Sequence, residues 1–245
     1  MAWKTPDRFW RRATVEPASD GWAVHLDAKP LRTPGKAPLV VPSAPLARAI
    51  AAEWDAIEDV IRPETLHFTR LSNSALDRVA PRREDVIADL AAYGTTDLLC
   101  YRAEAVSDLA ARQAEAWDPW LTWAAETLAA PLRTTTGLAP VPQPEASLAA
   151  LRSSVAENDS FALAALHELV ALSGSLVLGL AVSRQALRGD AAWDFSRIDE
   201  MWQVARWGAD DEAEAATALK RRDFLNAERL ILLLGAAQGS GSDGH

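Results

Sequence analysis

The stretch that decides the fold class begins with WAVHLDAKPLRTPGKAPLVVP at residues 22–42, after which the spacing of the apolar residues changes. Apolar side chains alternate at Trp22, Val24 and Leu26, and proline and glycine interrupt the residues that follow. A period of two indicates strands, and Pro or Gly between short apolar runs indicates turns. We therefore expect a small antiparallel β-rich region over residues 1–42.

The next segment, SAPLARAIAAEWDAIEDVI at residues 43–61, has a helical period instead. Its large apolar residues recur at spacings of three and four: Leu46, Ile50, Trp54, Ile57 and Ile61. Such spacing places them on one face of a helix. The predicted fold class is α+β, with a mainly helical region over residues 43–235. A Pro-rich loop is expected at residues 134–145 and a disordered polar tail at residues 236–245.

Two features of the helical region lead to specific expectations. Ser107 is suited to cap a helix, and Pro119 would cost about 3 kcal/mol inside one. We therefore expect one helix to end at Trp117 and another to begin at Pro119, with Asp118 as its N-cap. The run LVALSGSLVLGLAVS at residues 169–183 is too short for a membrane span and predicts one buried core helix.

Composition narrows the function classes. The chain has 245 residues, 49% hydrophobic and 24% charged, which is typical of a globular protein. Its formal charge of −9 argues against a nucleic-acid partner, which would require a concentrated basic surface. Cys100 is the single cysteine, which favours a reducing compartment. The N-terminus lacks the apolar core of a signal peptide, so we expect a cytoplasmic protein without membrane insertion.

Catalytic signatures are missing from the sequence. It contains no phosphate-binding GxxxxGK loop, no GxGxxG that opens a helix after a strand, no HExxH and no GxSxG motif. The four histidines are scattered, and no pair has metal-ligand spacing. We therefore predict no catalytic residue, no bound metal and no cofactor.

The most distinctive stretch is IDEMWQVARWGADDEAEA at residues 198–215. Its acids crowd into five positions, as Asp210, Asp211, Glu212 and Glu214. If Gly208 ends one helix and Asp210 starts the next, the helix dipole alone explains them. A second interpretation is a metal-dependent hydrolase that uses Asp199, Glu200, Asp210 and Asp211 as oxygen ligands. A third is a surface that recognises another protein.

Two tryptophans precede these acids. Trp202 shares a helical stripe with Ile198, Met201 and Ala205, which predicts that it is buried. Trp207 lies off that stripe and is the better contact candidate, because aromatic anchors with charged rims are common in binding hot spots. The predicted partner-binding residues are Trp207, Asp210, Asp211, Glu212 and Glu214.

Six blocks together resemble a known family. They are LDAKPLRTP (26–34), LARAIAAEWDA (46–56), TRLSNSALDRV (69–79), TDLLCYRA (96–103), WDPWLTW (117–123) and IDEMWQVARWGADDEA (198–213). In this order they are similar to motifs of the ATP synthase assembly chaperones that handle the α subunit of the catalytic head. Any single block would be weak, but six blocks extend over nearly the whole chain.

The resemblance implies a chaperone without enzymatic activity, which binds unassembled α subunit and prevents its aggregation until the β subunit replaces it. It also implies roles for Glu53 and Trp54, and for the acids Asp210, Glu212 and Glu214. The resemblance does not show which of these residues contact the partner and which stabilise the fold. The same question is open for Trp202. We expect a monomer in the bacterial cytoplasm; organellar relatives would act in the mitochondrial matrix.

Overall fold

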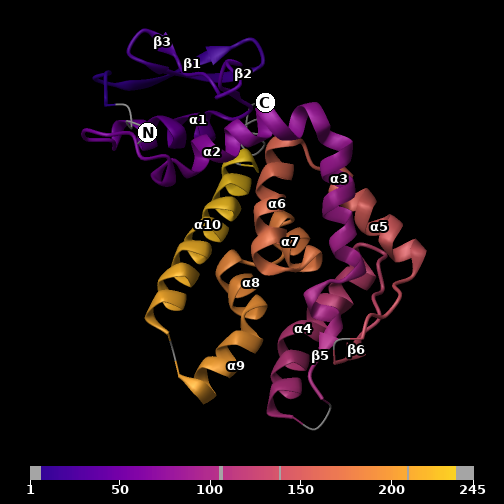
Figure 1. Cartoon of the computed structure of the whole chain (residues 1–245). Coiled ribbons are helices and arrows are strands. Elements are labelled where there is room, and N and C mark those ends of the chain that lie inside the picture. Colours follow the sequence, from indigo (N-terminus) through magenta and orange to yellow (C-terminus); the bar gives the residue numbers. More distant parts are fainter. Residues whose placement is uncertain (1–6, 105–106, 138, 209, 236–245) are drawn as a thin grey trace, which may run out of the picture. The chain divides into compact units, whose positions relative to one another are not determined.

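The computed structural model describes residues 7–104, 107–137, 139–208 and 210–235. The chain divides into two compact units, and Figure 1 shows its helices and strands. Unit 1 contains the chain up to Arg82, together with Ser160–Ala165 and the chain from Arg229 onward. Unit 2 contains Arg83–Asp159 and Leu166–Glu228. A small antiparallel sheet precedes mostly helical structure, so the predicted α+β class is confirmed.

The sheet belongs to unit 1 and has short strands. They are β1 (Ala13–Ala18), β2 (Gly21–Leu26), β3 (Lys29–Pro30) and β4 (Val40–Val41). β2 pairs antiparallel with each of the other three. The alternation seen in the sequence fits this arrangement, because Val24 and Leu26 point into the core while His25 between them is only half-buried.

Helix α1 (Ala44–Asp55) packs on strands β1 and β2. The side chain of Ser43 caps it by accepting a hydrogen bond from the backbone N–H of Leu46. Leu46 and Ile50 are completely buried on the predicted face. The helix ends at Asp55, so Ile57, which is also buried, follows the C-terminal end of the helix. The expected helical face is therefore correct but shorter than the sequence pattern.

Unit 1 continues with a short turn η1 (Pro63–Thr65) and helix α2 (His67–Ser74). A π-helical segment η2 (Ala75–Val79) and the turn η3 (Ala80–Arg82) follow directly. Unit 2 begins with α3 (Arg83–Ala92) and the turns η4 (Tyr93–Thr95) and η5 (Leu98–Cys100).

The other helices of unit 2 are α4 (Asp108–Thr127), α5 (Glu145–Ala156), α7 (Leu176–Ser183), α8 (Gly189–Ser196) and α9 (Ile198–Trp207). Two further helices, α6 (Ser160–Ser173) and α10 (Asp211–Gly235), contribute residues to both units. Strands β5 (Tyr101–Arg102) and β6 (Thr135–Thr136) pair in parallel. The sequence pattern contained no sign of these two short strands, since neither is long enough to alternate.

The expectation of a helix boundary at Pro119 is wrong. Helix α4 runs without interruption through Pro119, and Asp118 is not its N-cap; Ser107 is. Gln113, Trp117 and Ala124 are buried on one face of α4, on both sides of the proline. Pro119 itself is exposed. Burial of this face offsets the lost backbone hydrogen bond, because tertiary packing supplies most helical stability in proteins.

The apolar run at residues 169–183 is buried as expected, but it forms two helices instead of one. Helix α6 ends at Ser173, Gly174 has φ +72°, and Ser175 caps α7 through its side chain. A positive φ is readily adopted by glycine and stops the helix. None of the helices in the described part of the chain combines the length and apolarity that crossing a bilayer requires.

Candidate partner-binding face

In unit 2, helix α9 is followed by the first part of α10, and the two helices run in different directions (Figure 1); we call this part of the unit the α9–α10 corner. Gly208 ends α9 with φ +92°, and its N–H donates to the carbonyl of Val204. The Asp210 carboxylate then accepts from the backbone N–H of Glu212 at 3.0 Å, and its carbonyl accepts from the N–H of Glu214 at 2.9 Å. Asp210 is therefore the N-cap of α10. The helix-terminus interpretation of the acids holds at least for this residue.

The C-terminal part of α9 exposes its large apolar residues. Met201, Val204 and Trp207 are 61%, 46% and 75% exposed and follow one another at a spacing of three. The prediction that Met201 and Ala205 line a buried stripe is wrong, because both are exposed and α9 has no buried residue. The helix packs on α4 and α8, but this packing leaves Met201, Val204 and Trp207 at the surface. We call Met201, Val204 and Trp207 the apolar strip.

Trp202 lies beside the apolar strip and is half-buried. The guanidinium of Arg206 stacks 3.9 Å from the centroid of its ring, and the Trp207 ring meets it edge-on at 6.1 Å. Its indole Nε1 is shielded from solvent and has no hydrogen-bond partner in the described structure. Stacking on an aromatic face engages the Arg206 charge. In the described structure, Arg206 therefore contacts the Trp202 ring and forms no ion pair with the acids at the start of α10.

A shallow open groove of about 350 Å³ lies between α9 and the first turns of α10. Its lining residues are Arg197, Glu200, Gln203, Val204, Trp207, Gly208, Ala213 and Thr217. Two members of the apolar strip, Val204 and Trp207, form its apolar part.

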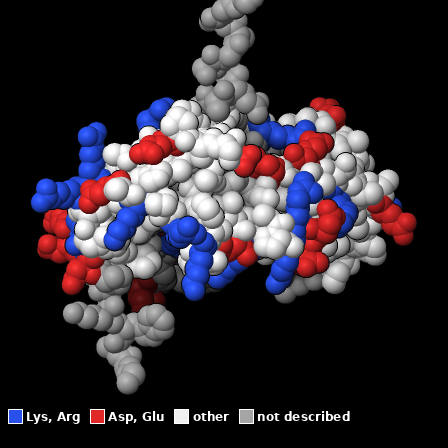
Figure 2. Space-filling view, turned by 90° about the horizontal axis from the view of Figure 1, so that it is seen from above, with Lys and Arg blue, Asp and Glu red and all other residues white. Residues whose placement is uncertain are grey.

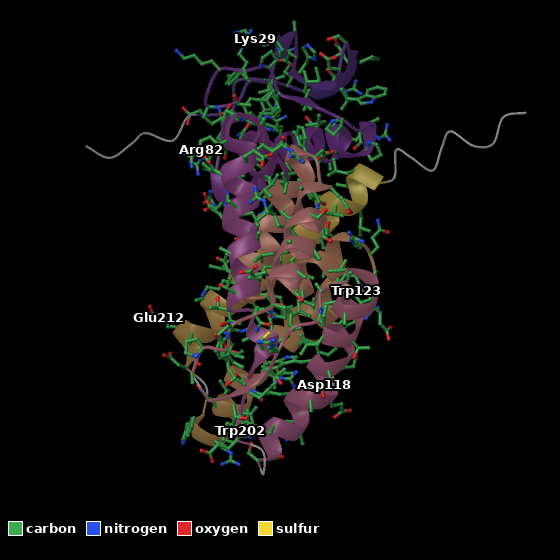
Figure 3. The ribbon with its side chains drawn as sticks, turned by 90° about the vertical axis from the view of Figure 1, so that its right-hand side faces the viewer. Lys29, Arg82, Asp118, Trp123, Trp202 and Glu212 are labelled. Carbon is green, nitrogen blue, oxygen red and sulfur yellow. The ribbon has the colours of Figure 1, made fainter. Side chains whose placement is uncertain are left out.

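The acids at the start of α10, Asp210, Asp211, Glu212 and Glu214, are exposed. On the face that Figure 2 presents, basic and acidic side chains are interspersed, whereas the first turn of α10 carries Asp211, Glu212 and Glu214 without a cation. No ion pair joins these three to a cation among the described residues. Figure 3 labels Trp202 on α9 and Glu212 on α10, the two helices that form the corner.

The acids point to different sides of α10. Successive residues turn by about 100° around a helix, so Asp210 and Glu214 lie on the side of the groove residues Ala213 and Thr217. Asp211 falls on the opposite side by the same count. Glu214 is therefore the acid that borders the groove without a capping role.

The hydrolase interpretation requires carboxylates that converge on one point. The described part of the chain contains no group of three or more His, Cys, Asp or Glu side chains that could hold a metal ion. Three of the four proposed ligands have other partners, since the Asp210 carboxylate caps α10. Asp199 accepts a hydrogen bond from Gln113 at 2.7 Å, and Glu200 pairs with Arg197 at 3.0 Å.

Glu53 and Trp54 belong to unit 1 and connect α1 to α2. The Glu53 carboxylate accepts from the backbone N–H groups of Phe68 at 2.6 Å and Thr69 at 2.9 Å. It therefore supplies a cap for the first turn of α2, which has no side-chain cap of its own. Burial raises the pKa of Glu53, although these donors act in the opposite direction. Trp54 is 9% exposed and donates to the Thr69 hydroxyl.

Comparison with known proteins decides the family. The ATP12 chaperone protein model matches residues 7–125. The crystal structure of Atp12 from Paracoccus denitrificans is 50% identical, with a TM-score of 0.90, and the match covers 95% of this chain and 99% of that one. The chain belongs to the ATP12 chaperone family. An Asp-to-Lys mutant of the Paracoccus protein gives the same values. A candidate chaperone from Agrobacterium tumefaciens is 37% identical, with a TM-score of 0.89, over 94% of this chain and 86% of that one.

The suspected resemblance is thereby confirmed, and this ATP12 family member is an assembly chaperone of ATP synthase. The structure brings Trp202, Trp207 and the acids of α10 together at one corner of unit 2. It places Glu53 and Trp54 in the other unit, where both side chains are engaged within the fold.

Sequence reasoning missed a buried carboxylate in this ATP12 protein. Asp97 is fully buried and accepts from the N–H of Leu99, the hydroxyl of Ser175 and the N–H of Val177, at 3.0, 2.8 and 3.0 Å. It holds η5 against the start of α7, and burial raises its pKa. The local signal is an acid just before LLC, suited to cap η5. Its second partner, Ser175, is too distant in sequence to infer.

Proposed function

We propose that this chaperone binds the α subunit of the ATP synthase catalytic head before assembly and keeps it from aggregating until the β subunit replaces it. Membership of the ATP12 family indicates the process, which is assembly of ATP synthase. The α9–α10 corner has a surface suited to binding a subunit during that process. The proposal rests on one observation. The exposed apolar strip is followed by acidic side chains that form no ion pair with a cation among the described residues.

The apolar strip is suited to cover apolar surface on an unassembled subunit. Contiguous apolar side chains at a surface commonly mark a place where another protein binds. Trp207 is 75% exposed and has the size and rigidity of a hot-spot anchor. A subunit that has lost its assembly partner exposes apolar patches of its own, so each surface would shield the other.

The acids are suited to guide the encounter and to permit release. Exposed charges mainly increase association rates and specificity, and they add little to the final affinity. A moderate interface of this kind can be displaced by a partner with a larger one. In our proposal the chaperone acts by binding alone, as a monomer and in the bacterial cytoplasm.

Co-purification tests this function. Tagged chaperone is mixed with freshly unfolded and diluted α subunit, with β subunit as a parallel sample, and light scattering records aggregation. We expect the chaperone to retain the α subunit on the affinity resin, to suppress its scattering, and to release it when folded β subunit is added. Retention of the β subunit but not of the α subunit would overturn the proposal.

A further inference from the structure

The groove between α9 and α10 has walls made only of helices. Apart from the groups at the helix ends, the backbone N–H and C=O groups of α9 and α10 are used within the helices themselves. Recognition by strand addition needs an exposed sheet edge with free N–H and C=O groups. No strand lines this groove among the described residues. An occupant must therefore be recognised through its side chains.

The shape of the groove favours a helix. Val204 and Trp207 on one wall are three residues apart, and Ala213 and Thr217 on the other are four apart. A helix presents its own side chains at the same spacings, so an apolar stripe can interdigitate with both walls. Ala213 and Thr217 are small and leave room on the α10 side for larger side chains of the occupant.

The charges around the groove favour a basic flank on that helix. The cations at the two ends of α9 are engaged, Arg197 with Glu200 and Arg206 with the Trp202 ring. Further along α10, neither Lys220 nor Arg221 forms an ion pair with Glu214 in the described structure. Glu214 borders the groove on the α10 side without a partner among the described residues, and Glu212 lies in the same turn. A lysine or arginine beside the apolar stripe of the occupant would meet uncompensated negative charge.

We infer that the groove takes an amphipathic helix of the α subunit, which seats its apolar stripe against Val204 and Trp207 and its basic flank against Glu214. The inference rests on the proposed function, since the α subunit is the partner named there. It adds the secondary structure of the bound segment, its pattern of side chains and the two walls that hold it.

Synthetic peptides test the recognition mode directly on the full chain. One peptide of about 15 residues carries leucines at helical spacing with lysines on one flank, a second has the same composition in scrambled order, and a third has glutamates in place of the lysines. The readout is the indole N–H resonance of Trp207, assigned from the spectrum of Trp207→Phe. We expect the first peptide to shift this resonance at concentrations where the other two do not. Equal shifts with the scrambled peptide would overturn the inference.

Variants then connect the groove to the α subunit itself. Val204→Glu adds a charge to the apolar wall and should weaken α-subunit binding about ten-fold or more. The matched control is Leu219→Glu, because Leu219 is 54% exposed on α10 and is not a lining residue of the groove. We expect the control to bind like wild type.

The two proposals fail in different ways. If wild-type chaperone does not bind the α subunit, the proposed function is wrong. If wild type binds and Val204→Glu binds equally well, the function stands and the groove is not the docking site. Circular dichroism of both variants establishes that each is folded, which we expect because α9 has no buried residue and Leu219 is exposed.

Discussion

Glu53 and Thr69 are joined by two hydrogen bonds. One oxygen of the carboxylate accepts from the Thr69 backbone N–H at 2.9 Å and from its hydroxyl at 2.8 Å. The same hydroxyl accepts from the indole of Trp54 at 3.1 Å. Two consecutive residues of α1 therefore hold one residue in the first turn of α2. We propose that the EW pair in the second family-like block is present to fix this junction.

Glu53→Gln tests the junction. The amide has one acceptor oxygen where the carboxylate has two, so at least one donor at the start of α2 loses its partner. An unsatisfied buried donor costs about 1–3 kcal/mol. We expect the free energy of unfolding, measured in urea at pH 7, to fall by about that amount. The control Glu64→Gln removes an exposed acid of η1 and should change it by less than about 0.5 kcal/mol.

The pH dependence of this difference has a definite sign. Burial raises the pKa of Glu53 above 4.5. The Glu53 carboxyl group therefore stays protonated in the folded protein at a pH where it is ionised in the unfolded chain. The stability contributed by protonated Glu53 is present below pH 4.5 and is lost as the pH rises through the folded pKa. The amide that replaces the carboxyl group in the variant cannot titrate. The stability difference between wild type and variant should therefore shrink as the pH rises, and a growing difference would contradict the raised pKa.

Trp54→Ala should be much more damaging. Trp54 is 9% exposed and packs edge-on against Trp10 at 5.1 Å, so truncation leaves a large cavity. We expect a loss of about 3–5 kcal/mol in chemical denaturation. The matched control is Trp207→Ala, since Trp207 is 75% exposed. A Trp54→Ala variant with unchanged melting temperature and lost α-subunit binding would assign Trp54 to the interface instead of the core.

Asp97→Asn tests the buried carboxylate of unit 2. The Asp97 oxygens accept three hydrogen bonds, so an amide nitrogen in place of one oxygen faces a donor. We expect a loss of about 1–3 kcal/mol in the free energy of unfolding. A double-mutant cycle with Ser175→Ala should give a coupling energy of about 0.5–3 kcal/mol, because the two side chains share a hydrogen bond. Strict additivity would mean that Ser175 does not stabilise Asp97.

The fold class could be read from the sequence because the two periodicities are local. Val24 and Leu26 alternate within one strand, and Leu46 and Ile50 repeat within one helix. The wrong predictions concern features that depend on contacts between residues far apart in the sequence. Pro119 stays inside α4 because buried residues on both sides of it offset its cost, and a single sequence does not show which residues will be buried.

The site was only partly predictable for a related reason. Clustering of the acids and the end of α9 at Gly208 are visible in the sequence, since both depend on neighbouring residues. The exposure of Met201 depends on where α4 and α8 lie against α9, which has no local signal. Apolar residues at helical spacing predict a core stripe by default. Here the same spacing forms a surface.

The acids at the start of α10 differ in role. Asp210 caps the helix, so Asp210→Ala should lower the free energy of unfolding by about 0.5–2 kcal/mol. Glu214 is exposed and one turn further along, so Glu214→Lys should change stability by less than about 0.5 kcal/mol. Melting temperature and urea denaturation of both variants measure this difference.

Association with the α subunit should show the opposite order. Glu214→Lys replaces attraction toward a basic partner with repulsion, so association should slow at low salt, and its salt dependence should flatten or invert because ions screen exposed charges. Asp210→Ala should associate more nearly like wild type once the folded fraction is taken into account. Stopped-flow measurements at low and high salt test both variants. Loss of stability in Glu214→Lys, with normal association by the folded fraction, would assign Glu214 to the helix terminus and remove it from the recognition face.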